Sequence, residues 1–109
     1  MTGSPRELEL QRADAVREAL TAVIDPELGL DIVSLGLVYE VDVMDERARV
    51  TYTLTSMGCP LAPLIEQDIT AAALGVEGVE RVDTELTFDP PWSPDRMSED
   101  AQFGLGFAL

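Results

Sequence analysis

Residues 37–54, LVYEVDVMDERARVTYTL, decide the fold of this chain. Apolar side chains recur at every second position on either side of the turn-forming pair Asp45-Glu46. They are Leu37, Tyr39, Val41 and Val43 before the pair, and Ala48, Val50, Tyr52 and Leu54 after it. An alternation of period two is typical of strands with one buried face, so the stretch predicts a β-hairpin.

A helix is predicted before the hairpin. Ser4 is suited to the N-cap, Pro5 to the first helical position and Glu7 to the return bond of a capping box. Apolar residues then follow at helical spacing, namely Ala13, Val16, Leu20 and Val23. The helix should end near Ile24, because Pro26 disfavours helical backbone at the residue before it.

A second helix and a third strand are predicted after the hairpin. The helix follows Cys59 and Pro60 and has a C-terminal cap at Gly75. Its apolar stripe comprises Leu61, Leu64, Ile65, Ile69, Ala72 and Ala73. The strand runs from about residue 79 to residue 88, with one apolar face made by Val82, Leu86 and Phe88.

The resulting order, α-β-β-α-β, predicts an α+β fold, a two-layer sandwich with both helices on one face of a small, mixed three-stranded sheet. The third strand should run parallel to the second, because a helix connects them. We expect a single domain over residues 1–109, with its core in residues 5–88 and a C-terminal turn and short helix in residues 89–109. Ser93 is suited to cap that helix over residues 94–102, and an apolar tail follows over residues 103–109.

The acidic composition excludes several classes of function. The chain has 21 acidic and 7 basic residues, a formal net charge of -14 and no histidine. Such a charge repels phosphate backbones and anionic membrane surfaces, so neither nucleic acid nor a membrane is an expected partner. Without histidine, the chain also lacks the usual general base and the commonest nitrogen ligand for metals.

The single cysteine, Cys59, is the strongest candidate for chemistry. It rules out a disulfide within the chain, and together with the lack of a long apolar stretch it predicts a cytoplasmic protein. Backbone N–H groups at a helix start favour the thiolate, the form that attacks electrophiles and binds soft metals. The alternative, a cysteine buried as a small hydrophobic side chain, stays open.

Other candidate residues have structural alternatives of the same kind. Asp25, Glu27 and Asp31 are suited either to metal ligation or to turns in the segment 25–36, whose many aliphatic residues predict that it folds back onto the core. Threonines 51, 53 and 55 either donate hydrogen bonds near Cys59 or form a solvated strand face. Trp92, which lies among prolines, either caps the core or anchors a partner.

Four motifs in order make the chain resemble the MIP18-type iron–sulfur cluster assembly family, which includes the SufT-like and PaaD-like proteins. They are Asp25-Pro26-Glu27, Ser34-Leu35-Gly36-Leu37-Val38-Tyr39, Thr53-Leu54-Thr55-Ser56-Met57-Gly58-Cys59-Pro60, and Asp89-Pro90-Pro91-Trp92 followed by Met97-Ser98-Glu99. The resemblance covers about residues 8 to 107.

The resemblance implies a fold related to the C-terminal domain of NifU-like scaffolds and a non-enzymatic accessory role in maturing iron–sulfur proteins. It implies that Cys59 is the metal-binding residue. It also implies loop and partner contacts at the two acidic positions Asp25 and Glu27, at the cysteine motif and at Trp92. Within the cysteine motif the expected contacts are Thr55, Ser56, Gly58 and Pro60.

Two departures from related sequences shape the expected cofactor. The chain ends without the cysteine-rich C-terminal segment typical of PaaD-like proteins, and Ser56 stands where NifU-type scaffolds have the first cysteine of a Cys-x-x-Cys pair. A cluster usually needs four thiolates, whereas one chain supplies one. We therefore expect a transient iron or iron–sulfur cluster that the isolated protein need not retain. Its other ligands would come from a partner protein of the assembly machinery or a client apoprotein, from a small thiol, from a nearby oxygen donor, or from a second protomer in a homodimer.

Two other classes of function are kept as alternatives. In a protein–protein adaptor, Cys59 would be structural and the acidic surface and the segment 90–92 would dock a client or an assembly ATPase. In a cysteine-dependent enzyme, Asp25 or Glu27 would act as the base, although the lack of histidine argues against it. An RNA-binding KH domain is excluded by the charge and by the missing Gly-x-x-Gly loop.

Overall fold

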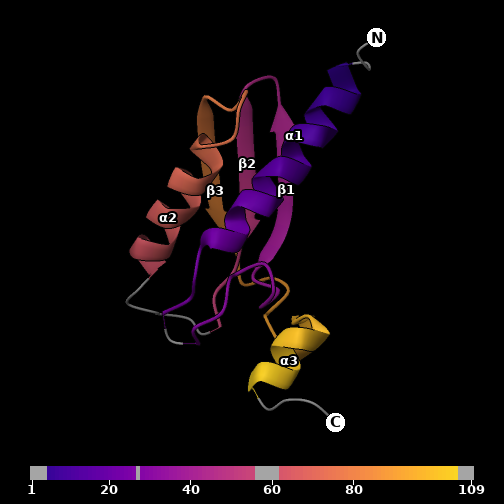
Figure 1. The fold of residues 1–109 in the computed structure, drawn as a ribbon. Helices are drawn as coiled ribbons and strands as arrows, with labels where there is room; N and C mark the ends of the chain where they lie inside the picture. Colours follow the sequence, from indigo (N-terminus) through magenta and orange to yellow (C-terminus); the bar gives the residue numbers. More distant parts are fainter. Residues whose placement is uncertain (1–4, 27, 56–61, 106–109) are drawn as a thin grey trace.

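A computed structural model of the chain describes residues 5–26, 28–55 and 62–105. Figure 1 shows the order of the elements, which confirms the predicted α-β-β-α-β arrangement. They are α1 (Pro5–Ala19) with the 3-10 turn η1 (Leu20–Ala22), β1 (Val38–Met44), β2 (Arg47–Tyr52), α2 (Ala62–Leu74), β3 (Arg81–Leu86), the 3-10 turn η2 (Pro94–Arg96) and α3 (Glu99–Leu105).

The three strands form a mixed sheet with β2 in the centre. β1 pairs with β2 in antiparallel fashion, with Val41 opposite Val50, and β3 runs parallel to β2, with Thr84 opposite Val50. The predicted hairpin and the predicted parallel crossover are both confirmed.

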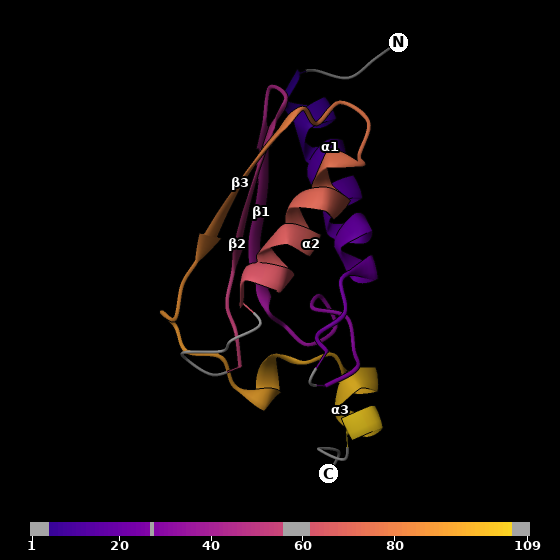
Figure 2. The ribbon, with the colours of Figure 1, turned by 90° about the vertical axis from the view of Figure 1, so that its left-hand side faces the viewer.

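Both long helices cover the same face of this sheet, as the side view in Figure 2 shows. α1 packs chiefly on β1 and α2 chiefly on β3. The core between the layers is aliphatic apart from Tyr52, and its innermost members include Val16, Leu20, Val43, Ala48, Val50, Ile65, Ile69 and Ala73. The predicted two-layer sandwich is therefore confirmed.

The opposite face of the sheet carries charged side chains instead of helices. Arg47 lies 3.4 Å from Asp83 and Arg49 lies 2.8 Å from Glu85, and all four side chains are exposed. Exposed ion pairs of this kind contribute little to stability. They keep this face soluble in water while the helices cover the other.

The predicted alternation in the first strand is wrong at its beginning. Val38, expected on the polar side, is buried, whereas Tyr39 is half-buried. The reason is a register shift between Val38 and Glu40, where β1 contributes one more residue than β2. Such a β-bulge reverses the alternation locally and redirects a side chain.

Several predicted boundaries and apolar faces also differ from the structure. The N-terminal helical region ends at Ala22, because Ile24 forms a bridge with Asp31. β3 is shorter than predicted, and Leu86 near its end is exposed, as is Leu64 in α2. Leu64 precedes Ile65, which takes the buried position in that turn.

The predicted C-terminal helix is divided in two. Met97 has extended backbone angles between η2 and α3. Ser93 makes no capping hydrogen bond with its side chain, whereas the Ser98 hydroxyl accepts one from the Ala101 N–H at 3.2 Å. Ser98, not Ser93, therefore caps the helix.

Candidate functional site

The candidate site lies at the end of the sheet opposite the hairpin turn, the lower end in Figure 1. β1 begins there beside the ends of β2 and β3, since Val38 pairs with Tyr52 and Tyr52 with Leu86. The loop over residues 23–37 and the segment over residues 87–98 meet at this end. So do Thr55 and Ala62, which flank the cysteine motif.

Five of the predicted site residues lie outside the described residues: Glu27, Ser56, Gly58, Cys59 and Pro60. Their roles stay predictions. Thr55 is described and is half-buried just after β2. In the described part of the chain, no three Cys, Asp or Glu side chains gather into a group that could hold a metal ion.

Asp25 is built into the turn that its loop makes. It is buried, its Oδ1 accepts a hydrogen bond from the Leu28 N–H at 3.2 Å, and its carbonyl accepts one from the Gly29 N–H at 2.7 Å. The Asp31 Oδ2 accepts a bond from the Ser34 N–H at 2.9 Å in the same way. These contacts support the turn-forming interpretation of both carboxylates.

The loop folds back onto the core, as predicted. Ile32 and Leu35 are fully buried, and Leu28, Leu30 and Val33 pack against the core from its edge. The loop is therefore a fixed wall of the site.

Trp92 ties the C-terminal segment to this loop. Its Nε1 donates a hydrogen bond to the Leu35 carbonyl at 2.7 Å, and its half-buried ring packs against the core. The Ser98 N–H donates to the Ser34 carbonyl at 2.8 Å, close to the same place. Of the two interpretations of Trp92, the structure supports packing on the core.

Thr53 differs from the expected row of solvated threonines. It is completely buried, and its backbone N–H donates to the Leu37 carbonyl at 2.8 Å. Its hydroxyl has no hydrogen-bond partner among the described residues. The signal that could have revealed its burial is its position between the apolar residues Tyr52 and Leu54, just where the strand ends.

A second polar group missed from the sequence joins α2 to the sheet. Glu66 accepts a hydrogen bond from the Thr84 hydroxyl at 3.0 Å. Burial raises the pKa of the Tyr52 phenol, and the nearby Glu66 carboxylate, which also accepts its hydrogen bond, raises it further. These contacts attach the beginning of α2 to β2 and β3.

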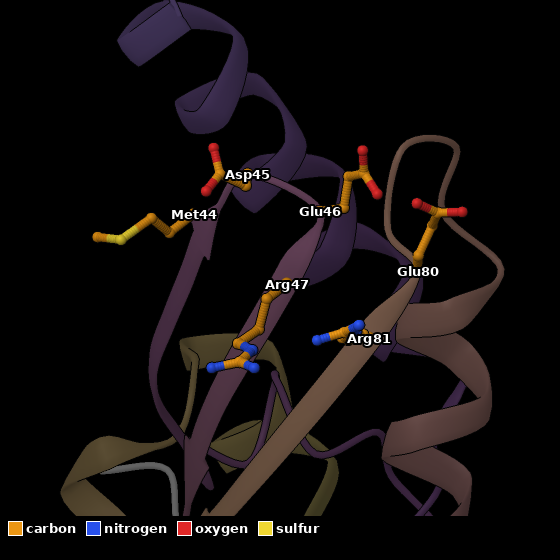
Figure 3. A pocket seen from close by; sticks show the side chains of 6 residues that line it. All are labelled: Met44, Asp45, Glu46, Arg47, Glu80 and Arg81. Carbon is orange, nitrogen blue, oxygen red and sulfur yellow. The ribbon is translucent and has the colours of Figure 1, made fainter.

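Another surface hollow lies at the hairpin end of the molecule. It has a volume of about 630 Å³ and is lined by Met44, Asp45, Glu46, Arg47, Glu80 and Arg81. Figure 3 shows Arg47 and Arg81 next to each other on neighbouring strands, with the carboxylates near the turns. This hollow has mixed charges and lies at the hairpin end of the sheet, so we do not treat it as a candidate site.

A smaller hollow of about 430 Å³ lies at the candidate end. Its lining comes from two of the family-like motifs and the turn η2, and comprises Gly36, Val38, Tyr39, Pro90 and Arg96.

No helix among the described residues is both long and apolar enough to cross a membrane.

Comparisons with known proteins agree with these features. A model of a family described as iron-sulfur cluster assembly protein matches residues 13–84. The chain is 50% identical over 90 residues to the Fe-S protein maturation auxiliary factor YitW of Bacillus subtilis, covering 81% of this chain and 87% of that protein. It is 43% identical over 73 residues to the iron-sulfur cluster carrier protein of Deinococcus radiodurans, covering 67% of this chain and 21% of that longer protein.

A crystal structure of a domain of unknown function, DUF59, from Bacillus anthracis has the same fold. Its TM-score with this chain is 0.89 at 40% sequence identity, and the alignment covers 93% of this chain and 97% of that one.

Proposed function

The chain belongs to the family of iron–sulfur cluster assembly proteins, and from that premise we propose that it is a non-enzymatic accessory factor in the maturation of iron–sulfur proteins. The matched relative from Bacillus subtilis is named as a maturation auxiliary factor, not as an enzyme. The lack of histidine agrees with this proposal, because the usual general base is missing.

In this proposal, Cys59 is the residue that binds iron or a cluster. The observation that carries it is that the chain's only thiol stands in a motif bounded by Thr55 and Ala62, where β2 ends and α2 begins. Thiolates are the ligands preferred by iron–sulfur clusters. Asp25 and Trp92 support this end of the molecule by holding the loop and the C-terminal segment against the core.

The cluster is cargo, not a permanent part of the protein. One thiolate cannot complete a cluster that usually has four, so the remaining ligands must come from elsewhere. Candidates are the assembly machinery, a client apoprotein, a small thiol and a second copy of the chain. The relative from Deinococcus radiodurans is named a cluster carrier, which supports transient association as the mode of action. A cytoplasmic location agrees with a reduced thiol and stays part of the proposal.

Complementation of a strain deficient in iron–sulfur protein maturation tests the role of Cys59. We expect the Cys59→Ser variant to fold but to lose complementation, because a hydroxyl is a poor ligand for iron in a cluster. Arg49→Gln, which changes an exposed side chain on the open face of the sheet, is the control and should complement. Full complementation by Cys59→Ser, with unchanged capture of partners, would instead favour the adaptor in which the cysteine is structural.

A further inference from the structure

The smaller hollow at the candidate end has rigid walls. The Tyr39 hydroxyl donates a hydrogen bond to the Pro90 carbonyl at 2.8 Å, which fixes one side. On the other side Gly36, with a φ of +75°, packs so closely that a Cβ there would clash with the Arg96 carbonyl oxygen. Preformed walls are characteristic of binding sites for small groups.

The β-bulge in β1 places Tyr39 in this hollow. A regular strand would have put Tyr39 on the core side, whereas the register shift after Val38 leaves it half-buried and turned toward the C-terminal segment. Bulges of this kind are common beside functional sites, because they redirect a side chain. The tyrosine ring thereby becomes a platform at the surface.

Arg96 lies over that platform. Its guanidinium carbon is 4.7 Å from the centre of the Tyr39 ring. Among the described residues, Arg96 forms no ion pair and its side chain donates no hydrogen bond, although the chain has 21 acidic residues. Because the guanidinium lies over the ring and no acceptor among the described residues takes its N–H groups, these groups remain available to a ligand.

The charge of the molecule favours a carboxylate over a phosphate as that acceptor. A phosphate carries up to two negative charges, and a net charge of -14 opposes the approach of a dianion more than that of a monoanion. A planar carboxylate also matches the fork of a single guanidinium through two parallel hydrogen bonds. The volume of about 430 Å³ is within the range of small-ligand pockets.

We propose that this hollow is a binding site for one carboxylate group, held by Arg96 on the Tyr39 ring. The carboxylate can belong to a small thiol or to the end of a peptide, and both sources present the same chemistry to the arginine. The site does not depend on Cys59, so it goes beyond the function proposed above.

The test is an NMR titration of the labelled protein that follows the Arg96 Nε–H and Gly36 N–H signals. Two pairs of probes are used: N-acetyl-L-cysteine against its amide, and acetyl-triglycine against its amide. We expect both signals to shift saturably with at least one acid and with neither amide. The acid that binds more tightly identifies the source. Equal shifts with acid and amide, or no saturable shift with either acid, would overturn the proposal.

Variants separate this site from the cysteine. Arg96→Gln should weaken binding of the acid about tenfold or more, because a charge-assisted contact is lost. Arg49→Gln, which removes an exposed arginine on the open sheet face, should bind normally, as should Cys59→Ser. Normal binding by Arg96→Gln with an intact spectrum would contradict the assignment, whereas failure of the cysteine proposal would leave these results unchanged.

Discussion

The buried hydroxyl of Thr53 is the least satisfied group in the described part of the molecule. The residue is fully buried at the end of β2, and its Oγ1 has no hydrogen-bond partner there. A buried polar group without a partner costs about 1–3 kcal/mol. Thr53 belongs to the sequence motif that contains Cys59, so the unsatisfied hydroxyl destabilises the fold next to the candidate site.

Replacing this hydroxyl by a methyl group should therefore stabilise the protein. For Thr53→Val we expect the free energy of unfolding to rise by about 1 kcal/mol, because the shape is kept and the unsatisfied oxygen is removed. Urea unfolding measures the change. Thr53→Ser is the control that keeps the hydroxyl and should lose stability, since it removes a buried methyl. A less stable Thr53→Val variant would mean that the hydroxyl has a partner in solution.

At the scale of elements, two loops hold the candidate end together. The loop over residues 23–37 and the segment over residues 87–98 meet through the hydrogen bond of Trp92 and the close packing of Gly36 on Arg96. Neither loop contains a long helix or a strand, so backbone contacts fix their shape. Among these contacts, we expect the packing of Gly36 on Arg96 to be the most sensitive to substitution, because a Cβ at position 36 would meet the Arg96 backbone.

Gly36→Ala should destabilise the protein more than the same change at Gly29. Both glycines have positive φ angles, +75° and +74°, so both changes carry a similar cost in backbone strain of about 1 kcal/mol or more. A Cβ at position 36 would in addition meet the Arg96 carbonyl, whereas at position 29 no atom of the described residues lies within 4 Å. We expect a difference of about 1–3 kcal/mol in the free energy of unfolding, measured with urea. Equal losses for the two variants would contradict the close packing.

Most elements follow from local patterns in the sequence, and the misses have identifiable physical causes. The hairpin and the α2 core positions follow from periodicity, because each contains a regular buried face. The bulge at Tyr39 and the burial of Thr53 do not, because pairing register and tertiary packing decide them. For the candidate site, the sequence singles out Asp25 and Trp92 and offers a turn as one role for Asp25, whose contacts are local. It does not reveal that Trp92 donates to Leu35, since that contact joins segments far apart in the chain.

At the scale of the whole molecule, the two ends of the sheet differ in kind. The hairpin end has exposed charges of both signs and a large open hollow. The other end combines the loop, the C-terminal segment and the two described residues Thr55 and Ala62, between which Cys59 lies in the sequence, and Tyr52 lies in the core next to this end.

The stability of the whole molecule should fall at alkaline pH through Tyr52. Its pKa in the folded state lies above the ordinary tyrosine value of about 10, so the contribution of the neutral phenol is fully present below about pH 10. This contribution is lost as the pH rises through the folded-state pKa, because the Tyr52 phenol ionises at a lower pH in the unfolded chain than in the folded protein. Urea unfolding at pH values on either side of 10 should show a smaller loss for Tyr52→Phe than for wild type. Equal losses would show that Tyr52 does not carry the effect.

Anaerobic titration with ferrous iron and sulfide, followed by absorption spectroscopy, tests the central claim about Cys59 most directly. We predict that wild type and the control Arg49→Gln develop thiolate-to-iron absorption. Light scattering, and a parallel titration with an added small thiol, will show where the other ligands come from. Cys59→Ser, with an unchanged fold, should develop none of it. The same absorption in Cys59→Ser, or none in wild type even with added thiol, would contradict the account.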